Sequence, residues 1–146
     1  MRRLSVVFVA LAAMAVPASA GVVEGMFEIE GGCFVRKYDA AHMRSHPDQL
    51  VTQISLETSA SQTERRRLTL SLDFEIRGGA HYSSEAYCTR ADDVCSIEGD
   101  GGSFSLSRKG GQVRLSVGDF LAVEGDTDFS PDLANSDDRV FLLDPC

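Results

Sequence analysis

The sequence predicts an all-β fold, a small antiparallel barrel or sandwich of about eight to ten short strands. The main evidence is residues 68–77, where apolar and polar side chains alternate without interruption. Such alternation gives a strand one buried face and one solvated face. Glycines then recur between shorter apolar segments, at positions where tight turns need positive φ angles. Barrels and sandwiches share this pattern, so the sequence leaves the choice between them open.

The individual strands follow from the same two-residue period and from the turn residues that separate them. The segment before residues 68–77 is also β-prone, and a polar serine-rich connector joins the two, so we expect them to form a hairpin. A turn at Gly118 and Asp119 is expected to separate two late strands. In chain order, the predicted strands are residues 26–30, 33–38, 51–56, 68–77, 81–88, 94–98, 103–107, 112–117, 120–124 and 139–143.

Only one helical turn is expected, near residues 39–46. Asp39 is a good N-cap residue, and Pro47 disfavours helical backbone at the residue before it. The remaining long connection, residues 125–138, is polar and acidic and is predicted to be a surface loop.

The first 20 residues have the three parts of a secretory signal peptide. Two arginines precede an uncharged apolar run over residues 4–16, and Ala18-Ser19-Ala20 then places small residues before Gly21. The apolar run is shorter than the roughly 20 residues that span a bilayer. We therefore expect cleavage after Ala20, a single domain over residues 21–146 without a transmembrane anchor, and a secreted or periplasmic location.

The charge balance restricts the class of partner. The chain has 14 basic and 22 acidic side chains, a formal net charge of −8. Cleavage after Ala20 would remove two arginines and no acidic residue, which leaves 12 against 22 and a net charge of −10. Such a field repels phosphates, so a nucleic-acid partner is not expected. A basic protein, a cell-envelope component or a divalent cation is compatible with it.

Four cysteines, all after residue 20, predict two disulfides in an oxidising compartment. Three pairings are possible. The short spacing of Cys88 and Cys95 suits a hairpin, which would leave Cys33 to pair with Cys146. A zinc site is the alternative, but the chain has no pair of cysteines separated by two residues.

Two clusters are candidate metal ligands. His42 and His46 are four residues apart, so a helix would place both on one face as a zinc site requires. Asp126 and Asp128 alternate in an acidic loop in the manner of calcium ligands, although Pro131 stands where a calcium loop needs glycine. A metal-binding protein or metal-dependent enzyme that uses these residues with zinc or calcium is therefore one hypothesis.

The candidate binding patch lies on the predicted strand at residues 81–88. Alternation places His81, Glu85 and Tyr87 on the face opposite Cys88, which we expect to be the buried side. No serine lies in a nucleophile-elbow motif, and the cysteines are expected to be oxidised, so no catalytic residue is assigned. An enzyme is the less favoured class.

The favoured hypothesis is a small, secreted or periplasmic, acidic binding module that recognises a basic protein or envelope component. An inhibitor of a cationic enzyme such as a lysozyme would be one example, docking by charge complementarity. A metal-binding protein and a structural envelope protein are the alternatives. The sequence specifies neither the ligand nor the oligomeric state.

Overall fold

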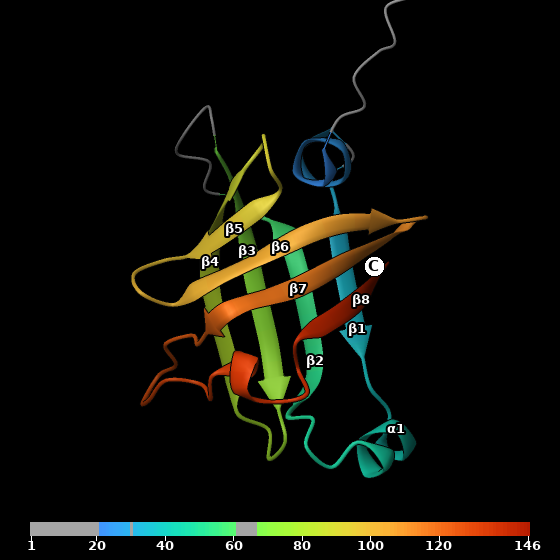
Figure 1. The fold of residues 1–146 in the computed structure, drawn as a ribbon, viewed down its shortest axis with the longest axis vertical. Coiled ribbons are helices and arrows are strands. Elements are labelled where there is room, and N and C mark those ends of the chain that lie inside the picture. Colours follow the sequence, from blue (N-terminus) through green and yellow to red (C-terminus); the bar gives the residue numbers. More distant parts are fainter. Residues whose placement is uncertain (1–20, 30, 61–66) are drawn as a thin grey trace, which may run out of the picture.

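The computed structural model describes residues 21–29, 31–60 and 67–146, so the predicted signal segment, residues 1–20, lies outside the described residues. Eight antiparallel strands in these ranges form a closed barrel in which each strand pairs with its sequence neighbours and β8 returns to β1 (Figure 1). The predicted all-β class is confirmed, and the choice between barrel and sandwich is settled as a barrel. The strands are β1 (Cys33–Lys37), β2 (Val51–Thr58), β3 (Arg67–Ile76), β4 (His81–Thr89), β5 (Val94–Ile97), β6 (Gly102–Lys109), β7 (Gln112–Leu121) and β8 (Val140–Pro145).

The predicted alternation builds the core. On β3, the side chains of Leu70, Leu72 and Phe74 are at most 1% exposed, and they pack inside the barrel with buried residues of the other strands. The expected hairpin is confirmed, because β2 and β3 pair antiparallel from Val51–Ile76 to Thr58–Leu70. The largest fully buried side chains are Phe27, Phe74, Phe104, Phe141, Ile54, Leu56, Leu70, Leu72, Leu115, Leu121, Leu133 and Leu143.

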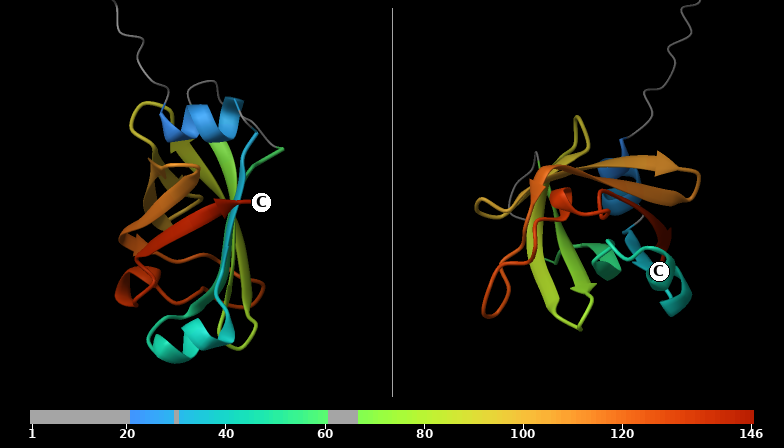
Figure 2. Two further views of the ribbon diagram at one scale, coloured as in Figure 1. Left: turned by 90° about the vertical axis from the view of Figure 1, so that its right-hand side faces the viewer. Right: turned by 60° about the horizontal axis from the view of Figure 1, so that its bottom comes forward.

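Two short helices lie at opposite ends of the barrel (Figures 1 and 2). The predicted helical turn is α1 (Ala40–Ser45), and the Asp39 carboxylate caps it by accepting a hydrogen bond of 2.7 Å from the His42 N–H. Within the described ranges, neither helix has the length and hydrophobicity needed to cross a bilayer.

The other helix corrects the prediction of a strand at residues 26–30. Val23–Ile29 form η1, a π-helix that lies across one end of the barrel. Val22, Val23, Met26 and Phe27 are all buried, and their spacing matches one helical face better than it matches a strand. The Asp93 carboxylate caps this helix from the distant β4–β5 hairpin.

The prediction of a turn at Gly118 and Asp119 is also wrong, because β7 runs through both residues without a break from Gln112 to Leu121. Gly118 instead permits a close approach of two strands. A Cβ atom there would lie 2.9 Å from the Ser103 carbonyl oxygen on β6 and 2.7 Å from the Ser103 hydroxyl. The register between β6 and β7 shifts at this point, between Gly102 and Phe104. The glycine therefore belongs to a strand irregularity and not to a hairpin.

The cysteines form two disulfides, Cys33–Cys146 and Cys88–Cys95, and none of the four is free. Cys33–Cys146 lies at the β1–β8 seam, where only two residue pairs, Phe34–Pro145 and Val35–Asp144, are in register. Cys88 and Cys95 are direct cross-strand neighbours of β4 and β5. Two structural disulfides indicate an oxidising compartment.

Candidate functional site

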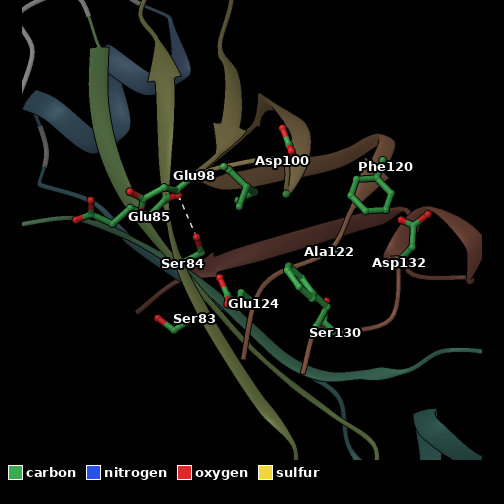
Figure 3. A pocket seen from close by; sticks show the side chains of 14 residues that line it. Ser83, Ser84, Glu85, Glu98, Asp100, Phe120, Ala122, Glu124, Ser130 and Asp132 are labelled. Atoms are coloured by element: carbon green, nitrogen blue, oxygen red, sulfur yellow. Dashed lines mark hydrogen bonds between the residues drawn. The ribbon is translucent and has the colours of Figure 1, made fainter. Parts of the chain in front are cut away.

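A cleft of about 810 Å³ opens in the barrel wall, beside the N-terminal half of β4, where Ser83, Ser84 and Glu85 line it (Figure 3). It is bordered by β4, by the β5–β6 turn, by the end of β7 and by the segment that follows β7. In Figure 3 the β4 residues lie on one side of the cleft, and Phe120 and Asp132 lie on the other. The lining residues are Ser83, Ser84, Glu85, Ile97, Glu98, Gly99, Asp100, Gly101, Phe120, Ala122, Glu124, Phe129, Ser130 and Asp132.

The cleft exists because β5 is much shorter than β4. The β4–β5 pairing covers only Ala86–Ile97, Tyr87–Ser96 and Cys88–Cys95, and one further backbone bond of 3.1 Å joins the Glu98 N–H to the Glu85 carbonyl. On its other edge, β4 pairs with β3 all the way to His81. Among the described strands, the residues of β4 that precede Glu85 therefore pair with β3 on one edge and have no strand on the other edge.

The start of β6, directly after the turn that follows β5, depends on glycine. Gly102 has a φ angle of +90°, and a Cβ atom there would lie 2.0 Å from the Phe120 carbonyl oxygen. Any other residue would need both a strained backbone and a displaced β7. This tight crossing returns the chain to β6 after only four residues of β5, and it places Phe120 at the rim of the cleft.

The lining is strongly acidic. Five of its side chains are carboxylates and none is lysine, arginine or histidine. Glu98, Asp100 and Glu124 are exposed, and none of their carboxylates has a hydrogen-bond or ion-pair partner among the described residues. These three carboxylates are therefore available to a ligand, and their negative charge makes the cleft attractive to a cationic group.

The other two carboxylates hold the walls in place. The Glu85 carboxylate accepts hydrogen bonds from the Ser59 hydroxyl at 3.1 Å and from the Tyr87 hydroxyl at 3.4 Å. The Asp132 carboxylate accepts bonds of 3.0 Å from the Leu121 and Ala134 N–H groups. Asp132 thus fixes the segment after β7 to the end of that strand.

Two exposed phenylalanines add an apolar surface to the acidic one. Phe120 is 45% exposed and Phe129 is 64% exposed, and both line the cleft. Exposed phenylalanine is costly to solvate and is typical of sites that bury aromatic surface against a partner. Aromatic faces beside carboxylates suit a cationic side chain with an apolar stem.

The segment that carries Phe129 lies at the surface, as predicted for residues 125–138, but it is also fixed to the barrel. Ser130 exchanges two bonds with Val123: its N–H donates to the Val123 carbonyl at 2.8 Å, and its hydroxyl accepts from the Val123 N–H at 3.0 Å. Leu133 and Ala134, in the 3₁₀ turn η2 (Leu133–Asn135), are buried. The acidic pattern hid these anchors, because hydroxyl and carboxylate groups that bind backbone amides look the same in sequence as solvated ones.

The predicted patch of His81, Glu85 and Tyr87 is divided in the structure. The opposite face, with Tyr82, Ala86 and Cys88, is the buried one as expected. Of the three patch residues only Glu85 lines the cleft, and the Tyr87 hydroxyl donates a hydrogen bond to the Glu85 carboxylate. His81 instead lies beside Asp73, with 3.3 Å between Nε2 and Oδ1.

The predicted metal ligands are not brought together. His42 in α1 and His46 at its C-cap do lie side by side, but their rings stack on each other at 4.1 Å, and Nε2 of His42 lies 2.9 Å from Oε1 of Gln49. Asp126 and Asp128 are exposed in the segment after β7. Across residues 21–29, 31–60 and 67–146, no group of three His, Cys, Asp or Glu side chains is placed to hold a metal ion.

Apart from Glu85, the residues that make the cleft acidic and aromatic were not predicted as site residues. A signal was present, since residues 98–102 combine two acidic residues with three glycines. Nothing in that pattern links it to Glu124 or Phe129, which reach the cleft only because β7 crosses beside the turn. A search of protein-family models, of curated proteins and of solved structures finds no match to this chain.

Proposed function

We propose that this protein is a secreted or periplasmic binding module that recognises a basic protein through the acidic cleft. The observation that carries the proposal is the set of three carboxylates, Glu98, Asp100 and Glu124, which have no partner within the described part of the chain and lie beside two exposed phenylalanines. An unpaired anionic cleft with aromatic walls is complementary to lysine or arginine side chains.

The charge of the whole chain supports the same partner class. A formal net charge of −8 attracts a basic protein at long range and repels nucleic acids and anionic lipids. The proposed location rests on the two disulfides together with the signal-like N-terminal segment. Both features fit a protein that meets its partner outside the cytoplasm.

The test is calorimetric titration of the purified protein with lysozyme, used as a small cationic probe protein, at low and at high salt. Binding is expected at 50 mM salt and is expected to weaken at least tenfold at about 300 mM, because ions screen charges beyond the Debye length. The triple variant Glu98→Gln, Asp100→Asn, Glu124→Gln is expected to lose about tenfold or more in affinity.

A matched control separates the cleft from the net charge. Glu75, Asp48 and Asp137 are exposed carboxylates outside the cleft lining. The variant Glu75→Gln, Asp48→Asn, Asp137→Asn removes the same charge and is expected to bind within about twofold of the wild type. Equal losses in both triple variants would show a nonspecific charge effect and would refute the cleft as the site.

A further inference from the structure

The cleft exposes a strand edge and not a strand face. Ser83, Ser84 and Glu85 are consecutive in β4, yet all three line the cleft. Successive side chains of a strand point to opposite faces of the sheet, so three consecutive residues border one space only where the strand turns its edge to it. The pairing data agree, because β5 has left β4 at this point.

This edge has hydrogen-bonding groups to offer. The Glu85 carbonyl points to the β5 side, where it accepts the last bond from the Glu98 N–H. In an antiparallel ladder, alternate residues direct their N–H and C=O groups to the same side. The N–H and C=O of Ser83 therefore point into the cleft, and no bond joins them to the segment after β7 in the described part of the chain.

We propose that the cleft receives an extended, arginine-bearing segment of the basic partner, which adds as a strand to the edge of β4 at Ser83. This inference rests on the proposed function and specifies how the partner binds. Backbone bonds to an open edge provide affinity, and side-chain pockets provide specificity. Every second side chain of the added strand would face the free carboxylates and the two phenylalanines, and a planar guanidinium suits both.

The occupant follows from charge complementarity. An open edge without side-chain selection would invite any β-prone chain, including a second copy of this protein. Here the three unpaired carboxylates on the rim repel an acidic chain such as this one and favour a cationic segment. The exposed ring of Phe129 gives the apolar stem of an arginine a surface to contact.

Two acetylated and amidated hexapeptides test the proposal, one of alternating arginine and valine and one of the same sequence with every peptide nitrogen methylated. Both carry the same charge, but only the first can donate backbone hydrogen bonds. The wild-type protein is expected to bind the methylated peptide at least tenfold more weakly. Hydrogen exchange of the Ser83 amide is expected to slow on binding of the first peptide, whereas that of the Ser105 amide on β6, which lies outside the cleft lining, stays unchanged.

The outcomes separate this inference from the proposed function. Equal affinity for the two peptides, together with weaker binding by the cleft triple variant, would overturn strand addition and leave the acidic cleft as the site. Unchanged exchange at Ser83 with the first peptide bound would also overturn it. Equal binding of the first peptide by the wild type and the cleft variant would instead refute the proposed function.

Discussion

Asp93 fixes the helix that covers one end of the barrel, and its replacement by asparagine tests that role. Its carboxylate accepts bonds of 2.9 Å from the Val22 N–H and 2.8 Å from the Val23 N–H, about 70 residues away in the chain. Asp93 itself has a positive φ angle of 54°, a conformation that asparagine tolerates well. The substitution Asp93→Asn therefore removes the charge and one acceptor oxygen while it keeps the backbone and the size.

The expected loss is about 2 kcal/mol of unfolding free energy. A hydrogen bond to a charged group contributes about 1.5–3 kcal/mol, and a negative charge at a helix N-terminus adds about 0.3–1 kcal/mol. Because one bond to asparagine can persist, the lower part of the combined range applies. The loss is limited by the buried face of η1, where Val23, Met26 and Phe27 are at most 2% exposed and still hold the helix on the core.

Urea and thermal unfolding of the purified variant measure this value, with an expected fall in melting temperature of roughly 5–10 °C. Amide exchange at Val22 and Val23 is expected to accelerate more than exchange in β3. The control is Asp137→Asn, an exposed carboxylate with no partner among the described residues, which is expected to change stability by less than about 0.5 kcal/mol. A change in Asp93→Asn as small as that of the control would refute the capping argument.

Three further predictions concern the barrel and α1. Gly118→Ala is expected to cost about 1–3 kcal/mol in urea unfolding, because the new methyl group meets the Ser103 carbonyl of β6. Replacement of both Cys33 and Cys146 by serine is expected to cost about 2–5 kcal/mol, because it leaves two residue pairs to close the β1–β8 seam. The hydrogen bond from the backbone N–H of His42 lowers the pKa of the Asp39 carboxyl below its ordinary value of 3.8. The stabilisation from this cap is therefore complete at neutral pH and is lost as the pH falls through the lowered pKa. A titration followed by carboxyl NMR is expected to give a midpoint for Asp39 below 3.8.

The parts of the fold that depend on local pattern were predictable, and those that depend on distant contacts were not. The alternation of Leu70, Leu72 and Phe74 specifies a half-buried strand wherever it lies, and the Asp39 cap specifies α1 in the same local way. The helix at Val23–Ile29 was missed because its cap comes from Asp93, far along the chain. Gly118 was misread because its reason is Ser103 on another strand.

The cleft was unpredictable for the same reason, and its position follows from the short pairing between β4 and β5 in the barrel wall. A strand of four residues, β5, faces a strand of nine, β4, so part of one edge must stay open. An open edge weakens a barrel, and the cross-strand disulfide Cys88–Cys95 lies within the three residue pairs that remain. The covalent bond secures the short pairing between β4 and β5. The chain can therefore turn away from β4 after Glu98, opposite Glu85, while β5 stays attached. On this argument the disulfide and the cleft belong together, because the bond stabilises the same short strand pairing whose unpaired continuation forms the site.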